Sequence, residues 1–230
     1  MTIDLQQQQH AFLLALRNGD EAGARTIVDR IRAAGVEPSR IYFDVFAPSM
    51  VTIGELWEQN QLSVAEEHLA TAITERLIGQ LSPWFNLPAT HGPERGTVVL
   101  GCVQGESHVL GLRMLADLFR KQGWRVLFLG ADVPHAEWAQ IAQRFNAQVV
   151  AISASTGRRE AQVRQLIQIV RAAAPSVHVL VGGAAFDVDP QLWQRVGADL
   201  YHPDAVTAVS IATAQYALSS THPPDRHTPA

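Results

Sequence analysis

The sequence has little cysteine, no long apolar run and no cluster of basic residues, and each absence excludes a class of protein. The single cysteine of the 230 residues, Cys102, excludes an intrachain disulfide. No apolar stretch is long enough to span a bilayer, and residues 1–9 lack the basic and apolar regions of a signal peptide. A net charge of −4 without a Lys/Arg cluster offers few counter-charges to phosphates. We therefore expect a cytoplasmic protein with no membrane partner and no direct nucleic-acid partner.

The remaining composition is that of an ordinary globular protein, with 47% apolar and 17% charged residues. No Ser-His-Asp, Cys-His or paired-carboxylate set stands out, so we do not expect side-chain catalysis. Cys102 lies inside the apolar run 97–103, where a small buried hydrophobic residue is expected.

Apolar residues recur at helical spacing through residues 5–85. A first helix carries Phe12, and Asp20 can cap a second one. A third helix opens at Pro38 and runs to Trp57, before the polar break at 58–61. Ser63, with a glutamate three residues later, forms a capping box that starts a fourth helix. Short connections between these helices predict an antiparallel four-helix bundle over residues 1–86.

Residues 87–96 are rich in proline and glycine and indicate a linker. Beyond it, short β-branched runs alternate with helical patterns. The runs cover residues 97–103, 125–129, 148–152 and 178–181, and the helical patterns cover 109–121, 136–145 and 160–173. This rhythm predicts an α/β domain over 97–218 with a doubly wound, flavodoxin-like parallel sheet. Such sheets bind ligands at the carboxyl ends of their strands. Residues 219–230 are polar and proline-rich and are expected to be a disordered tail.

The loop after the first strand of this sheet contains the pattern E-x-H-x-x-G, formed by Glu106, His108 and Gly111. Glu106 can accept a hydrogen bond from one ring nitrogen of His108 and leave the other as a metal ligand. Gly111 has no side chain at the start of the next helix, so a bulky group can approach the backbone. A loop histidine bonded to backbone is the alternative interpretation.

Two more loops support a ligand site at the same edge. The third strand ends in a cluster of small hydroxyl residues, 153–157, and the fourth ends in Gly182-Gly183. Paired glycines allow a flat or bulky group to lie against the backbone, although a tight turn before a helix would also explain them. We expect a valine at Gly183 to block the ligand without unfolding the protein.

Together these loops resemble the cobalamin-binding domain of methionine synthases, corrinoid methyl carriers and cobalamin photoreceptors. That family has D-x-H-x-x-G, then S-x-L, then G-G. Here Glu106 stands for the aspartate, and Ser155 stands where the leucine would be. The resemblance implies that His108 ligates cobalt from below while the nucleotide tail enters the sheet domain. It also implies cofactor contacts by Glu106, Ser107, Val109, Gly111, Ser153, Ser155, Thr156, Gly157, Gly182 and Gly183.

The helical half carries Trp57, nine intervening residues, and then Glu67-His68. For Trp57 the alternative is a tryptophan of the hydrophobic core. For Glu67-His68 the alternative is a solvated helix start, since the helix dipole favours a carboxylate in the first turn. The pattern is similar to that of light-responsive cobalamin photoreceptors related to the repressors of carotenoid synthesis. The resemblance implies that Trp57, Glu67 and His68 surround the 5′-deoxyadenosyl group of adenosylcobalamin. It further implies that light breaks the cobalt–carbon bond and that the cap then moves.

Two departures from those repressors bear on function. The chain begins at the cap without a helix-turn-helix domain, so binding to DNA by that route is not expected. Glu58 stands where the repressors have a second cobalt-ligating histidine. In both respects the chain resembles the photocobilins, which are stand-alone relatives that also bind a bilin such as biliverdin. Cys102 lies inside a strand, so a bilin would be held without a thioether link.

Three functions therefore remain open from the sequence. The cap pattern favours a light sensor, whose output would be a homo-oligomer or a downstream signalling protein. A corrinoid methyl carrier of a methyltransferase system is the alternative, but it must open its upper face to partner enzymes and needs no adenosyl pocket. A cobalamin store, or another nucleotide binder on the same fold, is the third.

Overall fold

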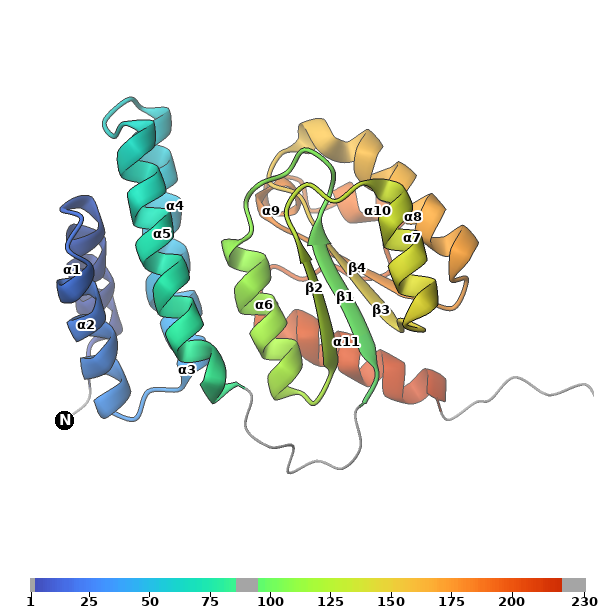
Figure 1. Ribbon diagram of the computed structural model, residues 1–230, viewed down its shortest axis with the longest axis horizontal. Coiled ribbons are helices and arrows are strands. Elements are labelled where there is room, and N and C mark those ends of the chain that lie inside the picture. Colours follow the sequence, from blue (N-terminus) through green and yellow to red (C-terminus); the bar gives the residue numbers. More distant parts are fainter. Residues whose placement is uncertain (1–2, 86–94, 221–230) are drawn as a thin grey trace, which may run out of the picture. The chain divides into compact units, whose positions relative to one another are not determined.

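The computed structural model describes residues 3–85 and 95–220, and it divides into two compact units, Met1–Thr90 and His91–Ala230 (Figure 1). The predicted linker at 87–96 falls largely outside the described residues. Within the described ranges, no helix combines the length and the apolar character that crossing a membrane requires.

The N-terminal unit consists of helices. These are α1 (Leu5–Arg17), α2 (Glu21–Ala33), α3 (Pro38–Ile41), α4 (Ala47–Glu58) and α5 (Val64–Leu81). Asp20 caps α2 by accepting the backbone N–H of Gly23 at 2.8 Å. The predicted capping box is present, because Glu66 accepts the Ser63 N–H at 2.7 Å and Ser63 Oγ accepts the Glu66 N–H at 3.3 Å.

The predicted third helix is continuous from Pro38 to Glu58, but it contains a π-helical segment, Tyr42–Phe46, between α3 and α4. Pro48 lies in the first turn of α4 and has no N–H to donate to the preceding turn. The wider π turn accommodates that missing donor, and such insertions are a known response to a broken helical ladder.

Aromatic pairs hold the core of this unit together. Phe12 stacks on Phe46 with ring centroids 4.9 Å apart, and Tyr42 stacks on Phe85 at the same distance. All four side chains are buried, so the π segment supplies two of the largest core residues. Burial of such rings is the main stabilising contribution to a small helical unit.

The C-terminal unit is built on a four-stranded parallel sheet with strand order β2-β1-β3-β4. The strands are β1 (Thr97–Cys102), β2 (Arg125–Gly130), β3 (Val149–Ser153) and β4 (His178–Gly182). Strand order reverses between β1 and β3, as in flavodoxin-like sheets. The predicted fold class, a helical cap followed by a doubly wound α/β domain, is confirmed.

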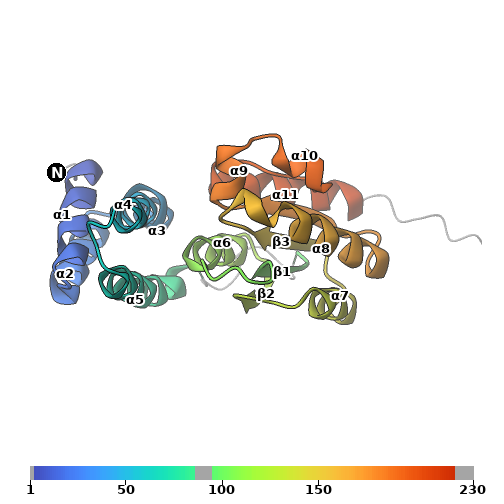
Figure 2. The ribbon, with the colours of Figure 1, turned by 90° about the horizontal axis from the view of Figure 1, so that it is seen from above.

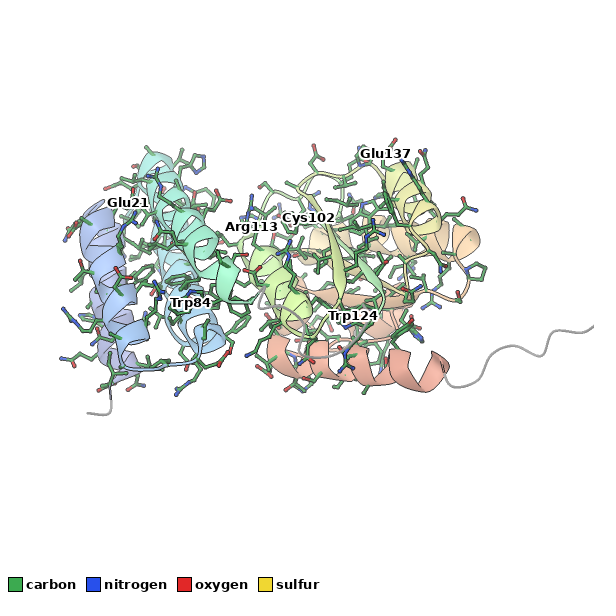
Figure 3. All side chains as sticks on the ribbon, turned by 60° about the horizontal axis from the view of Figure 1, so that its bottom comes forward. Glu21, Trp84, Cys102, Arg113, Trp124 and Glu137 are labelled. Atoms are coloured by element: carbon green, nitrogen blue, oxygen red, sulfur yellow. The ribbon has the colours of Figure 1, made fainter. Side chains whose placement is uncertain are left out.

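Helices cover this sheet. They are α6 (Leu110–Lys121), α7 (His135–Arg144), α8 (Glu160–Ala173), α9 (Ala184–Val188), α10 (Leu192–Val196) and α11 (Ala205–Ser220). Helix α6 packs against α11, and α7 packs against α8 (Figures 1 and 2). Trp124 is labelled in Figure 3 and is buried. Its indole N–H donates to Thr213 Oγ1 of α11 at 2.9 Å. This contact fixes α11 to the turn between α6 and β2.

The disordered tail was predicted to begin at residue 219, which is before the last helix ends. Helix α11 continues through Ser219 and Ser220, because the run from Ala205 contains neither glycine nor proline to end it. The rest of the predicted tail, residues 221–230, lies outside the described residues.

Candidate functional site

The carboxyl ends of β1, β3 and β4 lie side by side at the switch point of the sheet. Cys102 pairs with Ser153, which in turn pairs with Gly182. Because these are the last residues of their strands, the loops containing His108, Ser155 and Gly183 leave the sheet at one edge. The fold therefore brings together the three loops on which the sequence prediction rests.

Glu106 and His108 form the centre of this edge. His108 Nδ1 lies 2.5 Å from Glu106 Oε1, so the predicted hydrogen bond is present. The same oxygen accepts the backbone N–H groups of Ser107 at 2.9 Å and of His108 at 3.0 Å. Glu106 is only 2% exposed, whereas the His108 side chain is 74% exposed. A buried carboxylate thus orients an imidazole that faces outward.

Ser155 completes this cluster from the β3–α8 connection. Its backbone N–H donates to Glu106 Oε2 at 2.9 Å, and its hydroxyl also donates to that oxygen. The Ser155 hydroxyl lies 3.1 Å from His108 Nδ1 as well. Serine, at the position where the family has leucine, therefore makes polar contacts that leucine cannot make.

The electrostatics of the cluster keep Glu106 ionised. Burial alone raises the pKa of Glu106, but the hydrogen bonds from His108 and Ser155 outweigh burial and hold that pKa well below its usual range. An ionised carboxylate at Nδ1 favours the tautomer with the proton on Nδ1. In that tautomer the acceptor nitrogen of the ring is Nε2, the atom that could ligate a metal.

The two glycines after β4 have different roles. A Cβ at Gly182 would meet no atom within 4 Å, and the same is true at Gly111 and Gly157. Gly183 has φ +100°, and a Cβ there would lie 2.5 Å from the carbonyl oxygen of Ala154. The expectation that a valine at 183 would leave the fold intact is therefore wrong, because both the backbone conformation and a neighbouring carbonyl require glycine.

The remaining predicted residues of this unit lie around the same edge. Ser107 and Thr156 are exposed, Val109 is the N-cap of α6, and Ser153 ends β3. Cys102 is buried, as predicted (Figure 3). Burial raises the pKa of its thiol to about 12, so this thiol is a poor nucleophile.

Trp57, Glu67 and His68 belong to the other unit. Trp57 is in the last turn of α4 and is 43% exposed, which excludes the core interpretation of this tryptophan. Glu67 and His68 lie in the first turns of α5, at the same end of the helix pair. His68 Nδ1 is 2.5 Å from Glu67 Oε2, and Glu67 Oε1 accepts the Thr71 hydroxyl at 2.9 Å. The two side chains are thus hydrogen-bonded to each other, and the His68 side chain is 73% exposed.

The sequence prediction missed Asp132, which contacts the histidine loop from the β2–α7 connection. Asp132 Oδ1 accepts the Gly105 N–H at 2.6 Å, and its own N–H donates to the Glu106 carbonyl at 3.0 Å. Asp132 has φ 50°, a left-handed conformation that aspartate tolerates better than most residues. The spacing of residues along the sequence does not show this contact, because only the fold brings the β2–α7 connection beside the histidine loop.

Known families account for both units. A model described as a B12 binding domain matches residues 96–210, and a second model with the same description matches residues 8–82. This chain belongs to the B12-binding domain family. It is a cobalamin-binding protein with a helical cap and a Rossmann-like domain.

The relatives of this B12-binding protein fall into two groups. Trimethylamine corrinoid protein 1 of Methanosarcina acetivorans is 28% identical over 199 residues, which is 85% of this chain and 91% of the relative. Dimethylamine corrinoid protein 1 of Methanosarcina mazei is 29% identical over 181 residues, 77% of this chain and 82% of the relative. The HTH-type transcriptional repressor CarH of Myxococcus xanthus is 28% identical over 195 residues, 84% of this chain but 63% of the repressor.

The fold also matches a solved structure. The monomethylamine corrinoid protein of Methanosarcina barkeri superposes with a TM-score of 0.78 at 20% identity, and covers 89% of this chain and 96% of that one. At this identity the match concerns the fold alone.

The residues at the sheet edge fit a corrinoid. A corrin supplies four equatorial nitrogens to its cobalt, so the protein needs to add only one axial side chain. Within residues 3–85 and 95–220, no group of three or more His, Cys, Asp or Glu residues could hold a bare metal ion. A single exposed, oriented His108 beside open glycine positions suits a cobalt that is already coordinated.

Proposed function

We propose that this protein is a light sensor that binds adenosylcobalamin, with His108 as the lower axial ligand of cobalt and the cap holding the upper ligand. The observation that carries the proposal is the placement of an exposed tryptophan, Trp57, at the same end of the cap as the hydrogen-bonded Glu67–His68 pair.

The chemistry of these three residues matches a nucleoside. An exposed indole offers a stacking surface to a purine. Glu67 is fixed by the Thr71 hydroxyl and bonded to His68, so a carboxylate and an imidazole are held where they can bond ribose hydroxyls. Methyl, as an upper ligand, would use neither feature.

When bound, adenosylcobalamin would supply a cobalt–carbon bond that visible light can break. The protein would supply position and electrostatics. The cap would be the element that responds to loss of the adenosyl group, and the signal would be a change of assembly or of partner. A biliverdin held without a covalent link is part of the same proposal, since the buried Cys102 thiol is unsuited to forming one.

A corrinoid methyl carrier is the second candidate, and a specific observation favours it. The trimethylamine and dimethylamine corrinoid proteins align over 91% and 82% of their own lengths, whereas the CarH repressor aligns over 63%. In that function the chain would present a methylated corrinoid to separate methyltransferases.

Ligand preference and light response distinguish the two candidates. Affinities for adenosylcobalamin and methylcobalamin are measured in the dark, and oligomeric state is measured before and after green light, with and without biliverdin. A sensor prefers the adenosyl form and changes its assembly on illumination. Equal affinity for both forms, with no change of assembly in light, would contradict the sensor and favour the methyl-carrier candidate.

Trp57→Ala tests the cap directly. We expect the preference for adenosyl- over methylcobalamin to fall about three- to tenfold, because one aromatic stacking contact contributes about 0.5–1.5 kcal/mol. Trp84→Ala is the matched control, since Trp84 lies in the same unit and stacks on the Arg32 guanidinium at 3.3 Å. An unchanged preference in Trp57→Ala would contradict the nucleoside role.

A further inference from the structure

Arg159 binds the turn that precedes His108, the proposed ligand of cobalt. Its Nη1 donates to the carbonyl of Gln104 at 3.2 Å, and its Nη2 donates to the carbonyl of Gly105. Arg159 ends the 3-10 turn Gly157–Arg159 just before α8. The two bonds therefore join loops that are distant in sequence, since Arg159 is 55 residues from Gln104 and 54 from Gly105. A guanidinium presents its donors in a fixed fork, which suits two successive carbonyls.

The backbone of the turn is shaped around this guanidinium. Gly105 has φ +81°, and a Cβ at that position would lie 2.6 Å from Arg159 Nη1. A Cβ here would be strained by the positive φ and would force the end of the Arg159 side chain to shift. The turn and the arginine form one packed unit.

The third nitrogen of the guanidinium faces the carboxylate that orients His108. Arg159 Nε lies 3.7 Å from Glu106 Oε2, which is too long for a hydrogen bond but close enough for an ion pair. This Nε is buried and has no hydrogen-bond partner among the described residues. An unsatisfied buried donor is costly, and attraction to the ionised Glu106 offsets that cost.

The turn is held on its other side by Asp132. Asp132 accepts the Gly105 N–H at 2.6 Å and donates to the Glu106 carbonyl at 3.0 Å. Gln104, Gly105 and Glu106 are therefore fixed by contacts from two different loops. A ligand loop that is fixed before binding loses less conformational freedom on binding.

We propose that Arg159 is a positioning residue that fixes the turn 104–106 so that His108 is presented to cobalt in one orientation. The inference rests on the proposed role of His108 as lower ligand and adds a residue that acts through Glu106 and the turn. The fork of hydrogen bonds to Gln104 and Gly105, together with the charge beside Glu106, carries it.

The test compares Arg159→Gln and Arg159→Lys with wild type, and Arg158→Gln is the matched control. Arg158 is the exposed neighbouring arginine on the same 3-10 turn. Two readouts are taken: amide hydrogen exchange of Ser107 and His108 in the cofactor-free protein, and the absorption spectrum of bound cobalamin, which reports histidine coordination. In Arg159→Gln we expect ~10-fold faster exchange at both amides and a ~10-fold smaller equilibrium constant for histidine coordination. Arg158→Gln should match wild type.

The outcomes separate this inference from the proposed function. If wild-type protein binds cobalamin without histidine coordination, the role of His108 itself is wrong. If wild type coordinates through histidine and Arg159→Gln matches it in both readouts, Arg159 has no positioning role. If Arg159→Gln does not fold, Arg159→Lys decides. Lysine keeps the charge but not the forked pair of donors. An equilibrium constant for histidine coordination between that of wild type and a tenfold loss therefore supports the inference, and a wild-type constant overturns it.

Discussion

Glu106 is the residue around which the candidate site is organised. One buried carboxylate accepts five hydrogen bonds, from the N–H groups of Ser107, His108 and Ser155, the His108 ring and the Ser155 hydroxyl. A buried charge is tolerated when its hydrogen-bonding capacity is filled in this way. Glutamate is one methylene longer than the family's aspartate, and here it reaches both its own loop and the β3–α8 connection.

The ionised form of Glu106 should contribute to stability in a pH-dependent way. The pKa of Glu106 in the folded protein is lowered from the ordinary glutamate value of 4.5. The stability that its carboxylate contributes is therefore fully present well above pH 4.5, and it is lost as the pH falls below that value. We expect Glu106→Gln to lower the unfolding free energy of the cofactor-free protein by about 2 kcal/mol at neutral pH. The difference from wild type should shrink as the pH falls below 4.5.

Denaturant unfolding at pH 7 and at several acidic values measures this difference. The transition of the sheet unit is the one to compare, because two compact units need not unfold together. A difference that grows as the pH falls, or a Glu106→Gln variant as stable as wild type at pH 7, would contradict the assigned charge state.

Gly182 and Gly183 allow fold and binding to be tested separately. Gly183→Ala should destabilise the sheet unit by about 2 kcal/mol, since it combines a positive φ of +100° with a contact of 2.5 Å to a backbone carbonyl. Gly182→Val should leave folding nearly unchanged, because a Cβ at this position meets no atom within 4 Å. If the nucleotide tail of cobalamin occupies that space, Gly182→Val should lose cobalamin uptake. Normal uptake by a folded Gly182→Val protein would show that the tail lies elsewhere.

The sequence predicted contacts between near neighbours and missed contacts between loops. The Glu106–His108 bond spans two residues, and its geometry follows from the spacing alone. The bond from Arg159 to Gln104 spans 55 residues and depends on how β1 and β3 pair. For Gly183 the sequence left a ligand contact and a tight turn both open, since its positive φ and its close approach to Ala154 are visible only in the folded backbone.

At the scale of elements, the start of α5 joins helix stability to the candidate adenosyl contacts. The capping box of Ser63 and Glu66 immediately precedes Glu67 and His68. Hydrogen bonding to Ser63 lowers the pKa of Glu66, so the box stays intact at neutral pH. The order of the first turn therefore determines where the Glu67–His68 pair is held.

Ser63→Ala should fray this turn. We expect the unfolding free energy of the cap to fall by about 1 kcal/mol, the usual effect of losing an N-cap hydroxyl. Amide exchange at Glu66 and Glu67 should accelerate, and the affinity for adenosylcobalamin should fall while that for methylcobalamin stays the same. Gln61→Ala, in the connection between α4 and α5, is the control. Unchanged exchange in Ser63→Ala would show that packing alone holds the turn.

Most elements could be predicted because their signals are local. The cap of α2 at Asp20, the capping box at Ser63 and the alternation of strands and helices after Gly96 all lie at the expected positions. The π segment at Tyr42–Phe46 could not be predicted, since helical spacing of apolar residues does not reveal one extra residue in a turn. Likewise, α11 ends later than expected, because the first polar residues of the expected tail still belong to the helix.

At the scale of the whole molecule, the residues of the proposed function are divided between two compact units. The sheet unit carries His108 at its switch point, and the cap unit carries Trp57, Glu67 and His68 at the end where α4 and α5 connect. The proposed roles of the two units can therefore be tested by substitutions in each unit alone.

Electron paramagnetic resonance of the Co(II) form can show whether His108 ligates cobalt from below. Protein labelled with ¹⁵N-histidine is loaded with unlabelled cobalamin and reduced. If His108 is the axial ligand, each cobalt line splits into a doublet from ¹⁵N, and His108→Ala loses that doublet. A triplet from ¹⁴N in the labelled wild-type protein would mean that the cofactor's own base remains on cobalt, and His108 would then not be the lower ligand.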